Sequence, residues 1–195
     1  MSDIATRLSR PFVPAVIALL TAACLAIAGC GSGGSDHQSS SGSSSASANG
    51  TANSAAALLG AGIAQANAKQ YQAAETTFRN VLVISPRNKL AWYNLGLLAQ
   101  IQNQTASALS AYSRALSIDP RYTPAMYNKA ILLERKDPHA ALALYKQITS
   151  INPKAATAYL RESFVYGRLG DKRTAAQARA RAIALDKRLS TIKAP

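Results

Sequence analysis

The sequence predicts an all-α fold, a right-handed superhelical solenoid of about four helix-turn-helix repeats that follows a disordered linker. Pro86, Pro120 and Pro153 recur at intervals of 34 and 33 residues, and each follows a short aliphatic helix end. Between them, apolar residues such as Leu90 and Leu97 recur at helical spacing. A helix pair that is apolar on both sides is stable only when it stacks on a neighbour, so the repeats are expected to form one array.

The composition limits the class of protein. The chain has 195 residues, with 22 Lys and Arg against 9 Asp and Glu, a formal net charge of +13 and 48% hydrophobic residues. This length suits one domain with appendages. One long apolar run, at the N-terminus, excludes a polytopic membrane protein. The two Cys and two His residues do not cluster, so the sequence argues against a metal site.

Residues 1–29 have the pattern of an export signal. Arg7 and Arg10 form a basic start, and residues 12–28 are almost entirely apolar. The run ends in Ile27, Ala28, Gly29 and Cys30, which resembles the lipobox of bacterial lipoproteins. That resemblance implies cleavage before Cys30 and acylation of its thiol. The alternative is an uncleaved signal anchor, because the run is close to the ~17 residues that span a membrane.

We therefore expect a lipid on Cys30 and a chain on the extracytoplasmic side, at the cell membrane or the outer membrane. Residues 30–54 comprise this Cys and a Ser/Gly-rich tract without any aliphatic side chain larger than Ala. Such a segment cannot bury a core, and we predict that it is a disordered linker.

The repeat domain is predicted at residues 55–195, in units at about 55–88, 89–122, 123–155 and 156–189. The third unit is one residue short, which we expect in the turn around Lys136, Asp137 and Pro138. The second unit carries an ordered set of aromatic, small and apolar residues, namely Trp92, Leu95, Gly96, Ala108, Tyr112, Ala115 and Pro120. At this spacing the set closely resembles the tetratricopeptide repeat.

This resemblance implies that the first helix of each unit lines a concave groove that binds a protein or an extended peptide. The residues at groove positions are Tyr93, Asn94, Leu97, Tyr127, Asn128, Ile131, Arg161 and Phe164. A carboxamide can both donate to and accept from a peptide backbone, which suits Asn94 and Asn128 for contact with a ligand. Asparagine at this place is also common in the family for structural reasons, so both roles remain open.

The fourth unit is expected to be a solvating cap. It has Arg179 at the position that is aromatic in the other three units, and an arginine can face water. Lys187 replaces the proline of the other units, so we expect the last helix to run on toward Ile192.

The sequence argues against an enzyme. No nucleophile is paired with a plausible His base, and His37 and His139 are expected to be exposed or structural. The carboxylates are scattered and form no acid–base motif. We expect no cofactor and no small-molecule substrate, and export argues against a nucleic-acid partner.

Two binding functions remain open. The first is a lipid-anchored adaptor for a protein or peptide. Resemblance to tetratricopeptide lipoproteins suggests envelope assembly, secretion or pilus biogenesis. The second is an electrostatic binder of anionic envelope polymer or lipid headgroups through the basic C-terminal helix. Only the second function should weaken steeply as salt increases.

Overall fold

The computed structural model describes residues 43–194, and it describes side chains from residue 52 onward. The predicted signal peptide, the predicted lipidation site at Cys30 and the first part of the linker lie outside these residues. The helix α1 starts at Ser43, within the segment that the sequence assigns to the linker. Residues 43–54 are rich in Ser and Ala and contain no proline, so nothing in their backbone prevents the helix from extending back from the first repeat.

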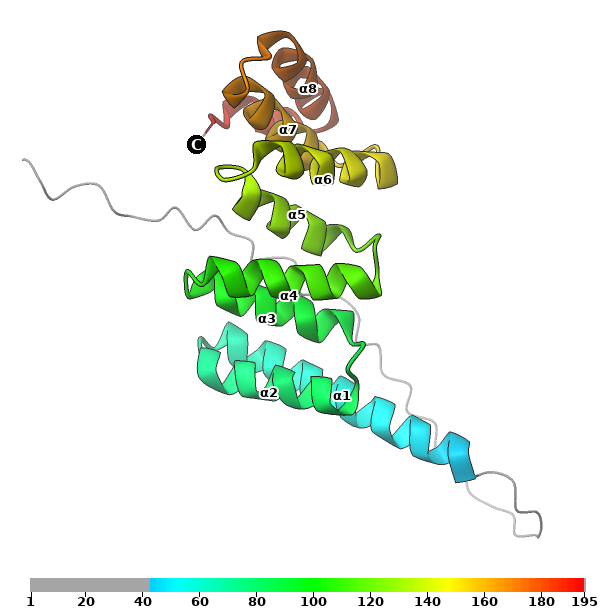
Figure 1. The fold of residues 1–195 in the computed structure, drawn as a ribbon. Coiled ribbons are helices and arrows are strands. Elements are labelled where there is room, and N and C mark those ends of the chain that lie inside the picture. Colours follow the sequence, from blue (N-terminus) through cyan, green and yellow to red (C-terminus); the bar gives the residue numbers. More distant parts are fainter. Residues whose placement is uncertain (1–42, 195) are drawn as a thin grey trace, which may run out of the picture. The chain divides into compact units, whose positions relative to one another are not determined.

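The described residues form eight α-helices and one short 3-10 helix, with no β-strand (Figure 1). In chain order these are α1 (Ser43–Asn67), α2 (Tyr71–Ile84), α3 (Lys89–Ile101), α4 (Thr105–Ile118), α5 (Thr123–Leu133), α6 (Pro138–Ile151), α7 (Ala156–Arg168), α8 (Lys172–Leu185) and η2 (Lys187–Thr191). The helices form four successive pairs, and each pair packs against the next. The predicted all-α repeat fold is confirmed.

We call the first three pairs, α1–α2, α3–α4 and α5–α6, the inner pairs. In each of them, an aromatic ring of the second helix lies against a small residue of the first helix. Phe78 on α2, Tyr112 on α4 and Tyr145 on α6 are fully buried. A Cβ atom placed on Gly62 would lie 2.6 Å from the Phe78 ring, and one on Gly96 would lie 2.5 Å from the Tyr112 ring. Only glycine allows the helix backbone to approach the ring this closely.

The turn inside a pair contains one residue in the left-handed region in three of the four units. These residues are Lys69 (φ 61°), Asn103 (φ 59°) and Gly170 (φ 85°). The third unit turns from α5 to α6 without such a residue at positions 134–137. The third unit is therefore one residue short between the start of α5 and the start of α6, where α5 is shorter than α3 and α7 and the turn lacks their left-handed residue.

The turn that ends each pair repeats the same geometry. Its first residue donates its N–H to the carbonyl four residues earlier, at Ser85, Asp119, Asn152 and Asp186, and the last three of these residues are extended. In the last three turns, the side-chain Oδ1 atom of this residue also accepts the N–H two residues further on, at 3.0 Å. This local bond is an Asx turn, which competes with continuation of the helix.

The expectation that the last helix continues toward Ile192 is wrong. The helix α8 ends at Leu185, and η2 follows a turn at Asp186. We expected the second helix of a unit to end because of the proline that follows it, and the last unit has Lys187 at that position. The Asx turn at Asp186, which binds the N–H of Arg188, forms without that proline.

The residues after α8 complete the core of the last pair. Leu189 of η2 is buried and forms an apolar cluster with Leu160 and Phe164 of α7 and Ala182 of α8. The chain therefore folds back over its own final pair. None of the described helices combines the length and the apolar character needed to cross a membrane.

Candidate functional site

The residues predicted to contact a peptide lie on the first helices of the last three pairs. We call them the first-helix face: Tyr93, Asn94 and Leu97 on α3, Tyr127, Asn128 and Ile131 on α5, and Arg161 and Phe164 on α7. Asn94, Asn128 and Phe164 are buried, with exposed fractions of 8%, 4% and 8%. The other five side chains stay partly accessible. The first-helix face therefore contributes both to the core and to the surface.

The two asparagines make hydrogen bonds within the protein. Asn94 donates its Nδ2 proton to the carbonyl of Leu90 at 2.8 Å, within α3. Asn128 donates to the hydroxyl oxygen of Tyr93 at 3.1 Å and so connects α5 to α3. Both amides thus have a structural role, and their contact with a peptide stays a prediction.

A group of aromatic rings surrounds Tyr93 where the second and third pairs meet. Its ring centroid lies 5.9 Å from that of Tyr112 and 5.4 Å from that of Tyr122. Lys89 lies over the Tyr122 ring and pairs with Asp119, whose pKa this hydrogen bond lowers. Burial raises the pKa of Tyr93, and it raises the pKa of Tyr122 to about 12. Both tyrosines are therefore neutral near pH 7 and act as packing and hydrogen-bonding groups.

A buried carboxylate lies where α5, α6 and α7 meet. Glu134 is 5% exposed, and its Oε1 atom accepts the hydroxyl proton of Tyr145 at 2.8 Å. Its Oε2 atom accepts a hydrogen bond from Arg168 at 2.9 Å, and Arg161 lies 3.4 Å from both oxygens. One carboxylate faces two guanidinium groups, so the cluster has a net charge of +1. Arg161 and Arg168 keep 19% and 38% of their side-chain surface exposed.

The charge of Arg161 is held firmly at this site. Burial acts to lower its pKa, but the Glu134 carboxylate and the hydroxyl of Tyr127 outweigh burial, so the net pKa is raised. Sequence reasoning missed this cluster because its bonds join residues 27 and 34 positions apart. The repeat register could have revealed it, since Glu134, Arg161 and Arg168 all fall at groove positions of their units.

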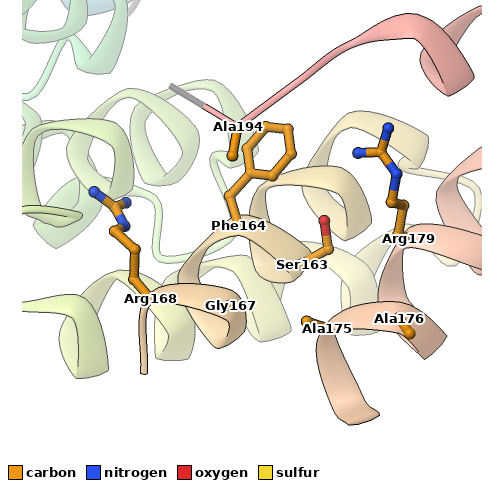
Figure 2. Close-up of a pocket in the computed structure, with 8 residues that line it drawn as sticks. All are labelled: Ser163, Phe164, Gly167, Arg168, Ala175, Ala176, Arg179 and Ala194. Carbon is orange, nitrogen blue, oxygen red and sulfur yellow. The ribbon is translucent and has the colours of Figure 1, made fainter. Parts of the chain in front are cut away.

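A cavity of about 310 Å³ lies between α7 and α8, close to this cluster (Figure 2). We call it the α7–α8 cavity. It is lined by Ser163, Phe164, Gly167, Arg168, Ala175, Ala176, Arg179 and Ala194. Most of its lining is small or apolar. Figure 2 shows Arg168 and Arg179 on opposite sides of Phe164, with Ala194 of the C-terminal tail beside the ring. The cavity thus combines an apolar interior with two cationic side chains.

Arg179, which the sequence suggested would face water, binds the backbone of the C-terminal tail. Its Nη2 atom donates to the carbonyl oxygens of Ser190 at 3.0 Å and Ile192 at 2.8 Å. The guanidinium therefore holds the tail after η2. At the same position the inner pairs have a buried aromatic ring, and the α7–α8 cavity lies beside this side chain in the last pair.

A second cavity, of about 400 Å³, is lined by residues of α2, α3 and α4 and of the turn between α3 and α4. Trp92 lies in its wall and donates its indole N–H to the carbonyl of Pro86 at 3.1 Å. No member of the first-helix face lines this cavity. The sequence did not predict it.

The described residues contain no group of three His, Cys, Asp or Glu side chains that could hold a metal ion. His139 is exposed on α6. Glu162 on α7 is buried and accepts a hydrogen bond from Thr149 at 3.1 Å, and burial raises its pKa.

Two stretches of the chain match the tetratricopeptide repeat. They are residues 56–87, within α1 and α2 and their connections, and residues 90–122, within α3 and α4 and their connections. The chain therefore contains repeats of this family in its first two helix pairs.

Two curated relatives share parts of the sequence. The BBSome complex member bbs-4 of Caenorhabditis elegans is 30% identical over 137 residues, which cover 70% of this chain and 30% of the relative. The peroxisomal targeting signal receptor of Kluyveromyces lactis is 37% identical over 54 residues, which cover 28% of this chain and 10% of the relative. The chain thus spans less than a third of the length of either protein.

Solved structures share the fold. The crystal structure of MamA aligns with a TM-score of 0.64 at 19% identity, over 76% of this chain and 87% of that chain. The structure of YrrB, described as a TPR protein with an unusual peptide-binding site, aligns with a TM-score of 0.60 at 23% identity, over 68% of this chain and 69% of that chain. The fold of the described residues is therefore that of a tetratricopeptide-repeat solenoid.

Proposed function

We propose that the chain is a lipid-anchored, extracytoplasmic adaptor that binds an extended segment of a partner protein along the first-helix face. Tetratricopeptide repeats typically serve as non-enzymatic scaffolds for other proteins. The observation that carries the proposal is the physical continuity of this face. Asn128 connects it from α5 to Tyr93 of α3, and Glu134, the residue that follows α5, pairs with Arg161 of α7.

The accessible part of the first-helix face suits an extended peptide. Leu97 and Ile131 are only partly buried and occupy equivalent places one unit apart. They offer apolar contact, while the partly exposed guanidinium of Arg161 offers hydrogen bonds. Apolar side chains placed beside polar groups on a rigid scaffold are the usual means of recognising a peptide.

Site-specific photocrosslinking tests the binding face. A photoreactive phenylalanine replaces Leu97 in one variant and Ile131 in another, in the chain's own cells. A third variant carries it at Gln147, which is exposed on α6. We expect one protein to be crosslinked from both Leu97 and Ile131 and not from Gln147. Crosslinks from Gln147 alone, or from none of the three positions, would reject the face.

The membrane anchor is tested separately. Cys30 follows an apolar run and small residues, which supports the proposal that its thiol carries the lipid. We expect Cys30→Ser to lose labelling by a fatty-acid probe and to accumulate uncleaved precursor, while Cys24→Ser is labelled normally. Undiminished labelling of the Cys30 variant would reject the anchor and leave the binding face untouched.

A second function is favoured by the charge of the C-terminal helix. The helix α8 has four basic residues and no acidic one, and Lys172, Arg173 and Arg181 are exposed. This surface suits an anionic envelope polymer or lipid headgroups. Binding of that kind should weaken steeply between low and physiological salt, whereas apolar contact along the first-helix face should weaken little.

A further inference from the structure

The last helix pair differs from the inner pairs in two ways that bear on ligand binding. It has a cavity at the place where an aromatic ring packs in the inner pairs, and it has two arginines and one glutamate beside that cavity. We propose that this pair binds an acidic side chain together with a bulky apolar side chain two residues away in the partner segment. The carboxylate pairs with Arg161 and Arg168, and the apolar side chain enters the α7–α8 cavity. This inference rests on the proposed function and specifies its ligand.

The cavity lies at the position where the other three pairs have an aromatic ring. Phe78, Tyr112 and Tyr145 fill the corresponding space in the inner pairs and are fully buried. The last pair has Arg179 instead, and this side chain is drawn toward the tail by its bonds to two carbonyl oxygens. The space left beside it has a volume of about 310 Å³. A ring supplied by another molecule can therefore occupy the place that the chain's own ring takes elsewhere.

The charge defines the second part of the ligand. Glu134 neutralises only one of the two guanidinium groups around it. Arg168 uses one nitrogen for Glu134 and keeps 38% of its side chain exposed, so donors remain for another acceptor. A guanidinium with a free edge binds a carboxylate through charge-assisted hydrogen bonds. The formal net charge of +13 on the whole chain also favours an acidic partner over a basic one.

Arg168 places the two parts of the site next to each other. It belongs to the Glu134 cluster and also lines the α7–α8 cavity. In an extended segment, alternate side chains point to the same side and successive ones to opposite sides. An acidic residue and a bulky apolar residue separated by one residue therefore face this site together. Two adjacent residues of the segment point to opposite sides, so they cannot both face this site.

Short fluorescent peptides test this ligand on the full chain. The first peptide has the order Asp-Ser-Phe within a Gly/Ser background and an amidated C-terminus. The second replaces Asp by Asn, and the third replaces Phe by Ala. Fluorescence anisotropy should show about tenfold weaker binding for each change, the scale of one charge-assisted bond or one buried anchor. Equal binding of all three peptides would overturn the proposal.

Protein variants assign the two contacts. Arg168→Gln should weaken the Asp peptide about tenfold and leave the Asn peptide unchanged. Arg179→Tyr places a ring in the cavity and should abolish the preference for Phe over Ala. The matched control is Arg114→Gln, which removes the same charge from an exposed place on α4 and should change nothing. Circular dichroism of each variant checks that the helices are intact.

The remaining outcomes separate this inference from the proposed function. If no peptide binds while Leu97 and Ile131 still crosslink one partner, the binding face stands and the ligand assignment is wrong. A fourth peptide, without Asp but with a free C-terminal carboxylate after Phe, tests another source of the charge. If it binds as tightly as the Asp peptide does, the acidic side chain is not what the site recognises.

Discussion

The second and the last helix pairs place different residues in the same packing position. In α3–α4, Tyr112 is fully buried against Gly96, and its hydroxyl donates to Gln100 at 2.8 Å. In α7–α8, Arg179 stands in the place of Tyr112 and binds backbone carbonyls of the tail. The first arrangement fills the space between helices, and the second leaves the α7–α8 cavity.

The difference reflects what each pair has beside it. The pair α3–α4 is packed on both sides, by α2 and by α5, so a ring there is fully desolvated and contributes its whole apolar surface. Beyond α8 the described chain supplies only η2 and a short tail. An arginine suits this place because its stem covers apolar surface while its charged end binds carbonyls and water. The two kinds of pair should therefore respond differently to mutation.

The largest expected effect comes from removing a ring of an inner pair. Tyr145→Ala deletes a fully buried side chain and the hydrogen bond to Glu134. We expect the free energy of unfolding to fall by about 3–5 kcal/mol, because the cavity cannot collapse fully. Urea denaturation followed by circular dichroism measures this loss.

Two controls make the comparison specific. Tyr145→Phe keeps the ring and should cost about 1.5–3 kcal/mol, because the lost hydrogen bond is to a charged carboxylate. Arg179→Ala makes a similar truncation at the equivalent, partly exposed place of the last pair, and it should cost no more than about 1 kcal/mol. Equal losses for the two alanine variants would show that the last pair is packed as tightly as the inner ones.

A smaller effect is expected from adding a methyl group to a glycine in each kind of pair. In Gly96→Ala, the new Cβ would lie 2.5 Å from the Tyr112 ring, so ring or helix must shift. We expect a loss of about 1–3 kcal/mol from this overpacking. Gly167→Ala, on α7, meets no atom within 4 Å. It should raise stability by about 0.5–1 kcal/mol, because alanine favours the helix. Thermal denaturation of both variants measures whether each change raises or lowers stability. Lower stability of Gly167→Ala would contradict open space beside Gly167.

The sequence predicted the repeat fold because its signals are local and recur. Helical spacing of apolar residues, small residues opposite aromatic ones, and regular turns each appear in several units, so an error in one is corrected by the others. The end of α8 at Leu185 was not predicted, because the prediction relied on the recurring proline. Proline is the conspicuous residue in the turns, but the bond formed by Asp119, Asn152 and Asp186 is what the last three turns share.

The candidate site was less predictable from sequence. Repeat register places side chains on a helix, but it does not show which of them satisfy each other. Asn128 binds Tyr93 from 35 residues away, and Glu134 collects partners from two other helices. The α7–α8 cavity depends on the direction that Arg179 takes, which the tail carbonyls decide. Such details come from tertiary contacts that no local pattern encodes.

The smallest expected effect distinguishes two buried carboxylates, Glu134 at the end of α5 and Glu162 on α7. Glu134 faces two arginines, whereas Glu162 accepts one hydrogen bond from Thr149. Burial raises the pKa of Glu162 above its ordinary value of 4.5. Because the folded state holds this proton more tightly than the unfolded state does, ionisation of Glu162 opposes folding. The penalty is complete above the folded-state pKa, shrinks as the pH falls through it, and is absent below about 4.5.

Glu162→Gln removes this penalty while keeping an acceptor for Thr149. We expect the variant to be more stable than the parent at pH 7, and the difference to vanish near pH 4. Urea denaturation of both proteins across this range measures it. Glu75→Gln is the control, because Glu75 lies in an exposed ion pair with Arg79 and should change stability by less than about 0.5 kcal/mol at any pH. If Glu162→Gln were destabilising at pH 7, the Glu162 carboxylate would contribute favourably to folding, and burial would not be the dominant influence on its pKa.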